Sequence, residues 1–128
     1  MQTSFHAFLL VACGGALGSA ARYGIALMAN NLSIQLPFGT LTANVLGCLL
    51  IGVFSQVAVN TTILSPGMRL FLTVGFCGGF TTFSTFVVEI LSLADTGQSI
   101  IPLLYAVSSV VLGLLALIAG VWLVKALL

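Results

Sequence analysis

The residues whose types and spacing are best suited to binding a ligand lie at positions 75–86, which read Gly-Phe-Cys-Gly-Gly-Phe-Thr-Thr-Phe-Ser-Thr-Phe. Three glycines weaken a helix at this point, and a helix that breaks frees backbone carbonyls and amides. Freed carbonyl oxygens can bind a cation, whereas freed amides and the four hydroxyls can bind an anion. We therefore predict a break over Gly78 to Thr81 that suits a cation, and a face over Phe83 to Phe86 that lines a path for an anion.

The phenylalanines of this stretch recur at every third residue, as Phe80, Phe83 and Phe86, so at least the last two share a helix face. The ordinary role of such a row is lipid contact or core packing. Here the row follows the predicted break and is interleaved with hydroxyl side chains, those of Thr81, Thr82, Ser84 and Thr85. Because an aromatic ring has a positive edge, an edge-on phenylalanine can line an anion path without supplying a fixed charge.

The composition decides which elements must position these residues. Hydrophobic residues make up 60% of the chain and charged residues 4%, with a mean hydropathy of +1.29, which lies outside the range of soluble domains. About 20 apolar residues are needed for a helix to cross a hydrocarbon core of about 30 Å. The apolar runs predict helices at about 5–29, 38–59, 68–93 and 100–127, the third broken near its middle. We predict an all-α integral membrane protein in which residues 1–128 form a single four-helix domain.

Several function classes are excluded by what the chain contains. One histidine, one glutamate and one aspartate are too few for a catalytic constellation, so an enzyme is not expected. The net charge of +1 offers no basic surface for nucleic acid, and no glycine-rich loop precedes a lysine for phosphate. Cys13, Cys48 and Cys77 lie in apolar runs without a CxxC spacing, which favours packing over zinc or redox chemistry.

Polar side chains inside apolar runs are costly to bury, so each is a functional candidate. Arg22 either snorkels to the membrane interface or attracts anions at the mouth of a path. Gly14 and Gly18 in the same run have the spacing that allows close helix packing. Thr40 and Asn44 lie four residues apart and share a helix face, where Asn44 either makes an interhelical hydrogen bond or offers its amide donors to an ion.

The third and fourth runs add further polar side chains. Glu89 follows Thr85 by four residues, and Tyr105, Ser108 and Ser109 place hydroxyls on about one face of the fourth helix. These groups either form a track that anions follow or an ordinary interhelical hydrogen-bond network, and Glu89 is alternatively an interfacial carboxylate.

The basic residues give little orientation signal. Arg69 and Lys125 fall near one side of the membrane and Arg22 toward the other, which is a weak bias under the positive-inside rule. The hypothesis that follows is insertion in both orientations, with two chains pairing antiparallel.

Three blocks, in this order on a chain of this length, closely resemble the Fluc (CrcB) fluoride channels: Gly14 to Tyr23, Phe38 to Gly52 and Gly75 to Phe86. The likeness covers essentially the whole chain. It implies a dual-topology homodimer in the lipid bilayer of the bacterial inner membrane, in which two antiparallel protomers enclose two fluoride pores.

The resemblance also implies roles for individual residues. Phe83 and Phe86 would line the pores, Asn44 would donate to fluoride, and Arg22 would lie in a vestibule. Backbone carbonyls of Gly78 and Thr81 would hold a structural sodium ion shared by both subunits. The remaining members of the fluoride pathway would be polar side chains of the second, third and fourth helices: Thr40, Thr82, Ser84, Thr85, Glu89, Tyr105, Ser108 and Ser109.

The implied function is passive efflux of fluoride, which enters cells as neutral HF, loses its proton inside and leaves as the anion under a negative-inside potential. Two other functions fit this sequence less well. A small multidrug transporter also has four helices in an antiparallel dimer, but it requires a carboxylate in the first helix, where this sequence has only Arg22. A purely structural membrane subunit would leave the coincidence of Asn44, the break and the phenylalanine–hydroxyl face unexplained.

Overall fold

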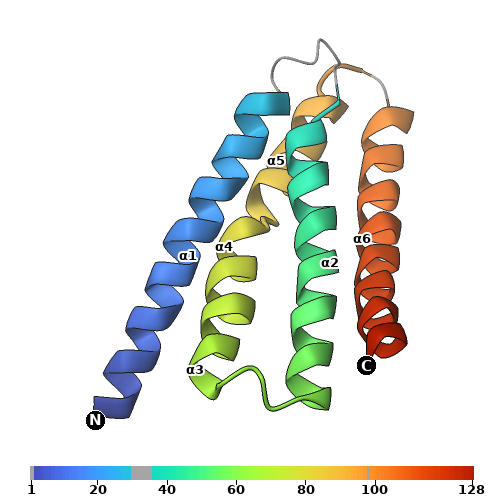
Figure 1. The fold of residues 1–128 in the computed structure, drawn as a ribbon. Helices are drawn as coiled ribbons and strands as arrows, with labels where there is room; N and C mark the ends of the chain where they lie inside the picture. Colours follow the sequence, from blue (N-terminus) through green and yellow to red (C-terminus); the bar gives the residue numbers. More distant parts are fainter. Residues whose placement is uncertain (1, 30–35, 98) are drawn as a thin grey trace.

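The computed structural model describes residues 2–29, 36–97 and 99–128. Its helices are α1 (Gln2–Ala29), α2 (Phe38–Asn60), α3 (Pro66–Arg69), η1 (Leu70–Cys77), α4 (Gly78–Phe80), α5 (Ser84–Ala94) and α6 (Ile100–Leu127). The four elements from α3 to α5 follow one another and form the third crossing (Figure 1). Four segments are long and apolar enough to span a membrane, and within the described residues there is no strand. The predicted fold class, with a third helix broken near its middle, is confirmed.

The helix ends differ slightly from the predicted ranges. The first helix starts at Gln2 rather than near position 5, and the third crossing starts at Pro66 rather than Met68. The earlier start of the third crossing has a local cause, because the Ser65 side chain accepts a hydrogen bond from the Met68 amide and proline suits the first turn of a helix.

The crossings are arranged so that α1 packs on the first half of the third crossing and α2 packs on α6 (Figure 1). The α1 contact is a close approach of backbones. A Cβ atom at Gly14 would overlap the Phe71 carbonyl oxygen, and one at Gly18 would overlap the carbonyl oxygen of Phe76. The predicted packing role of Gly14 and Gly18 is confirmed, since only glycine lets the two backbones come this near.

The position predicted for the break is wrong by about three residues. Gly78 is helical, with φ −63° and ψ −38°, and the chain leaves the helix only at Thr81, where φ is −88° and ψ is 157°. The interruption therefore comprises residues 81–83. Glycine permits a break but does not force one, and here Gly75 and Gly79 use their missing side chains to pack against the α1 backbone.

The first half of the third crossing contains a second irregularity that the sequence did not indicate. Residues 70–77 form a π-helix, whose hydrogen bonds join residues five apart in the chain rather than four as in an α-helix. The wider turn lies against α1 where Gly75 of η1 meets Gly14 of α1. Segments of this kind are frequent near functional sites in helices.

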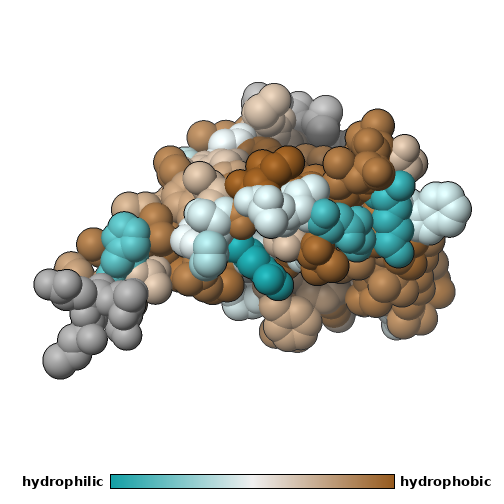
Figure 2. Space-filling view, turned by 60° about the horizontal axis from the view of Figure 1, so that its bottom comes forward, coloured by the Kyte–Doolittle hydropathy of each residue, from teal (hydrophilic) through white to brown (hydrophobic). Residues whose placement is uncertain are grey.

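The surface is that of a membrane protein. Large hydrophobic side chains are exposed along the flanks, among them Phe8, Leu103 and Trp122. Figure 2, in which the bottom of Figure 1 comes forward, shows hydrophilic side chains spread in a band across this face, with hydrophobic surface around them. The chain is thus a multi-pass membrane protein whose apolar flanks face lipid or another protein.

Candidate functional site

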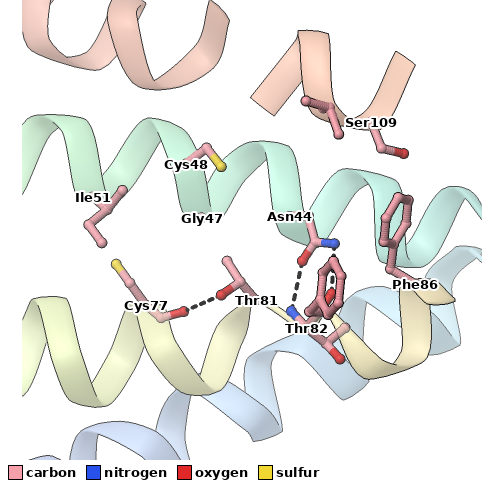
Figure 3. Close-up of a pocket in the computed structure, with 11 residues that line it drawn as sticks. Asn44, Gly47, Cys48, Ile51, Cys77, Thr81, Thr82, Phe86 and Ser109 are labelled. Carbon is pink, nitrogen blue, oxygen red and sulfur yellow. Dashed lines mark hydrogen bonds between the residues drawn. The ribbon is translucent and has the colours of Figure 1, made fainter. Parts of the chain in front are cut away.

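The interruption of the third crossing opens onto a cavity of about 350 Å³ between α2, the break and α6 (Figure 3). Its wall is mostly apolar, with a few polar groups that point inward, which is the usual character of a site for a small ligand. The lining residues are Asn44, Gly47, Cys48, Ile51, Cys77, Thr81, Thr82, Phe83, Phe86, Ser109 and Val110.

Asn44 holds the break from the neighbouring helix. Its Nδ2 donates to the Thr82 carbonyl oxygen at 2.9 Å, and its Oδ1 accepts from the Thr82 amide at 2.8 Å (Figure 3). One side chain thus satisfies both backbone groups of Thr82, which would otherwise be unpaired at membrane depth. The interhelical hydrogen bond expected as one of two roles for Asn44 is present, and the second Nδ2 hydrogen remains for another partner.

Thr82 in turn caps the helix that follows. Its Oγ1 accepts from the Thr85 amide at 3.3 Å and donates to Thr85 Oγ1 at 3.1 Å. The N-terminus of α5 is therefore ordered inside the membrane span by hydroxyls. A helix N-terminus carries partial positive charge, which favours an anion nearby. Ser84 and Thr85 are exposed on the outer side of this turn.

Two of the three phenylalanines gather at the cavity. The rings of Phe83 and Phe86 are 6.0 Å apart and tilted by 48°, so the prediction that they share a face is confirmed. Phe83 is 76% exposed, whereas Phe86 is 9% exposed and contacts the Tyr105 ring at 5.4 Å. Phe80 is separated from them by the break and stacks on Phe76 instead.

Glu89 lies at the centre of a hydrogen-bond network that joins three helices. The Thr40 hydroxyl donates to Glu89 Oε1 at 2.6 Å, and the Tyr105 hydroxyl donates to Oε2 at 2.7 Å. The structure therefore places the Glu89 carboxylate between α2, α5 and α6. Both carboxylate oxygens are satisfied by uncharged donors from α2 and α6.

The two serines of α6 face different surroundings, although the sequence placed them on about one face. Ser109 lines the cavity, and its buried Oγ has no hydrogen-bond partner within the described part of the chain. Ser108 donates to the Tyr105 carbonyl oxygen of its own helix at 3.2 Å. Ser108 and Tyr105 line a second hollow of about 770 Å³ between the ends of α2, α5 and α6.

Arg22 reaches from α1 to the third crossing, where its Nε donates to the Gly79 carbonyl oxygen at 3.2 Å. A side chain that only snorkelled to the interface would not make this contact. The contact puts a positive charge beside the last helical turn before the break. Sequence reasoning named Arg22 but did not connect it with the glycines.

Two backbone carbonyls at the break lose their usual donors. In a continuous helix the Gly78 carbonyl would accept a hydrogen bond from the Thr82 amide, but this amide donates to Asn44 instead. The Thr81 carbonyl would likewise accept from the Thr85 amide, which here donates to the Thr82 hydroxyl. Gly78 is exposed, and a Cβ placed there would meet nothing within 4 Å. Gly78 and Thr81 thus offer hard oxygen atoms of the kind that bind Na⁺.

The model of the family described as CrcB-like protein, Camphor Resistance (CrcB), matches residues 9–121. The chain is 48% identical over 125 residues to the fluoride-specific ion channel FluC of Chlorobium phaeobacteroides strain DSM 266, covering 98% of this chain and 97% of that protein. It is 45% identical to the FluC of Paracoccus denitrificans over 117 residues, 90% of this chain and 91% of the relative. The FluC of Leptospira interrogans is 46% identical over 118 residues, 91% and 93% of the two chains.

All three relatives are named as ion channels, in agreement with the prediction that the chain is not an enzyme. The family model spans the residues that form the cavity, the break and the Glu89 network. On these matches the chain belongs to the CrcB family.

Proposed function

We propose that this chain is a fluoride-specific ion channel that lets fluoride leave the cytoplasm passively and so reduces its toxicity. The observation that carries the proposal is the cavity at the break, which is lined by the buried Ser109 hydroxyl, the Asn44 amide and the rings of Phe83 and Phe86. The names of the relatives support fluoride as the ion.

The cavity has the chemistry that a small anion needs. Ser109 and Asn44 each have a hydrogen to donate, and the tilted rings of Phe83 and Phe86 can present their positive edges. None of these groups carries a full positive charge. An ion channel needs binding that is favourable enough for entry but weak enough for release, which uncharged donors provide.

The path continues through the Glu89 network. The contact between the Phe86 and Tyr105 rings lies between the cavity and the second hollow, which Tyr105 and Ser108 line. The Thr40 and Tyr105 hydroxyls are occupied by Glu89 and become available to fluoride only when one of these hydrogen bonds opens. Polar side chains thus continue from the break to the end of the bundle, and Ser84 and Thr85 extend them on the outer face of α5.

The functional unit in this proposal is an antiparallel homodimer in the bacterial inner membrane. Phe83 and Gly78 are exposed on one chain, although one is a pathway residue and the other a cation ligand in the proposal. A second copy would cover both and complete two pores. Reporter fusions at the C-terminus should label both sides of the membrane, and labelling of one side alone would refute dual topology.

The cation in this proposal is a structural sodium ion at the dimer centre. The Gly78 and Thr81 carbonyls fit it because hard oxygen atoms suit Na⁺ and their helical donors are engaged elsewhere. Within the described residues there is no group of three or more His, Cys, Asp or Glu side chains that could hold a metal ion. Elemental analysis of protein purified in sodium-containing and sodium-free buffers tests for the ion.

The decisive test of the function is anion efflux from liposomes that contain the purified protein. Rapid fluoride release without chloride release is the expected result. An absence of fluoride release would overturn the proposal. Movement of organic cations coupled to protons would also overturn it and would favour a small multidrug transporter.

A further inference from the structure

The break replaces two consecutive hydrogen bonds of the third crossing with contacts to two different neighbouring helices. In a continuous helix the Thr82 and Phe83 amides would each donate to the carbonyl four residues earlier, which for Phe83 is that of Gly79. The Thr82 amide donates to Asn44 of α2 instead (Figure 3). The Gly79 carbonyl accepts from Nε of Arg22 on α1, at 3.2 Å. Within the described residues the Phe83 amide makes no backbone hydrogen bond.

The reach of Arg22 follows from the packing of α1 on α4. A Cβ at Gly79 would overlap the Gly15 carbonyl oxygen, and a Cβ at Gly18 would lie 2.8 Å from the Phe80 amide nitrogen. The end of α4 therefore lies beside the turn of α1 from Gly15 to Gly18. Arg22 comes one turn later, and because the side chains of a helix tilt toward its N-terminus, Arg22 extends back over that turn.

Two properties of arginine are relevant at this place, its charge and the position of its donor. The hydrogen bond to Gly79 uses Nε, which lies within the side chain, and not the amino groups at its tip. A donor at Nε satisfies a carbonyl that has lost its helical partner, and an unpaired carbonyl at membrane depth is costly. This role depends on where the donor lies and requires no anion.

We propose that Arg22 is a positioning residue for the break and acts on the fluoride path through Phe83. Arg22 occupies the carbonyl to which the Phe83 amide would donate, and Asn44 occupies the Thr82 amide. Residues 81–83 are thereby held out of the helix from two sides. Closing the helix would return Thr81, which has a ψ of 157°, to helical backbone and would move Phe83 relative to the cavity that it lines.

Three substitutions separate the donor of Arg22 from its charge. The amide nitrogen of glutamine is as many bonds from Cα as the Nε of arginine, so Arg22→Gln keeps the donor and removes the charge. Arg22→Met has a methyl group at the same position and neither property, whereas Arg22→Lys keeps the charge and has a methylene there. Arg69→Met is the control, because it removes an exposed arginine from α3.

The hydrogen bond is measured by the ¹³C resonance of the Gly79 carbonyl in detergent. Glycine labelled with ¹³C at the carbonyl and phenylalanine labelled with ¹⁵N give signals from two Gly–Phe pairs, Gly75–Phe76 and Gly79–Phe80, and Phe80→Leu identifies the second. The Gly79 resonance should move in Arg22→Met and stay near its original position in Arg22→Gln and Arg69→Met, with Gly75 as the reference. An unmoved Gly79 resonance in Arg22→Met would overturn the proposal.

Fluoride efflux from liposomes tests the action on the path, and this readout rests on the proposed channel function. Efflux should fall about tenfold in Arg22→Met, since one hydrogen bond from a charged group is lost. Arg22→Gln should recover most of that loss and should exceed Arg22→Lys. If Arg22→Met does not fold, the order of the glutamine and lysine variants decides between donor and charge.

Higher efflux through Arg22→Lys than through Arg22→Gln would show that Arg22 acts by its charge, against the proposal. Full efflux through Arg22→Met, in a chain whose Gly79 resonance has moved, would show that the hydrogen bond does not act on the path. The carbonyl resonance does not depend on transport. A chain that carries no fluoride but shows the expected resonances would therefore contradict the channel function and not the role of Arg22 at the break.

Discussion

The first half of the third crossing, from Pro66 to Phe80, packs on α1, whereas the second half, α5, packs on α6 and leaves much of its surface uncovered. The first half is fixed by backbones that approach one another through glycines. The second half is fixed by hydrogen bonds from side chains of other helices, chiefly through Glu89.

The difference follows from what each half does in the proposed channel. Close packing excludes both water and ions, so we interpret the first half as a rigid anchor for the crossing. Hydrogen-bonding side chains leave room between helices, and the cavity opens where one arrangement gives way to the other. Polar groups that hold α5 in place are then also the groups that an anion can use.

The largest expected effect breaks the packed half. Gly18→Ala introduces a methyl group that overlaps the Phe76 carbonyl oxygen and lies 2.8 Å from the Phe80 amide nitrogen. Because backbone atoms cannot rotate away, unfolding should become easier by about 2–4 kcal/mol, measured by thermal unfolding in detergent. Gly24→Ala is the control, since nothing lies within 4 Å of that position. Equal stabilities of the two variants would contradict the close-packed anchor.

The second effect falls at the boundary between the halves. Asn44→Ala leaves the Thr82 amide and carbonyl without their partner, and should cost about 2 kcal/mol of stability and about tenfold or more in fluoride efflux. Asn60→Ala, at the exposed end of the same helix, should change neither. Wild-type efflux through Asn44→Ala would mean that the break does not depend on this amide.

Phe83 and Phe86 allow a buried ring and an exposed ring to be compared at the same cavity. Phe86→Ile should lower stability by about 1–2 kcal/mol because this ring is buried against Tyr105, whereas Phe83→Ile should stay within about 0.5 kcal/mol in a single chain. Both should slow fluoride efflux. Normal conduction by both variants would show that the ring edges of Phe83 and Phe86 do not line the path of the anion.

Tyr105→Phe removes one of the two hydroxyls that hold Glu89. The lost hydrogen bond at Oε2 should cost about 1 kcal/mol, and fluoride efflux should fall. A double-mutant cycle with Glu89→Gln should give a coupling energy of at least about 0.5 kcal/mol. Tyr23→Phe, on the exposed face of α1, serves as the control. Additive effects would show that the network is not cooperative.

The smallest effect concerns the serines. Ser109→Ala should slow efflux several-fold while stability changes by less than about 0.5 kcal/mol, because its hydroxyl has no partner to lose in the described part of the chain. Ser108→Ala should release fluoride at a rate closer to that of the unaltered chain, since the Ser108 hydroxyl donates to a carbonyl oxygen of its own helix. The reverse order in an efflux assay would place the wrong serine in the cavity.

The sequence predicted the crossings well because hydropathy alone determines them. Continuous apolar runs must be helical in lipid, so the fourth helix was predicted at 100–127 and is observed at Ile100–Leu127. The motif at 75–86 also indicated correctly that the third helix breaks. Its exact position was missed, since glycine serves close packing and backbone distortion equally well and the sequence does not say which.

The partners of the polar residues depended on the fold. Thr40, Asn44, Glu89 and Tyr105 could be named as polar groups at membrane depth, but that Thr40 and Tyr105 share Glu89 follows only from the helix arrangement. The neighbouring positions Ser108 and Ser109 differ by about 100° around the helix, and the packing of α2 decides which of them meets the cavity.

The sequence by itself determined the membrane class, the four crossings and the set of polar residues, because each follows from the cost of placing polar groups in hydrocarbon. Only the tertiary structure decided where the break lies, that both ends of Asn44 hold Thr82, and that Arg22 reaches the Gly79 carbonyl. These are contacts between residues far apart in the chain, and the register of packed helices, which no local pattern encodes, sets them.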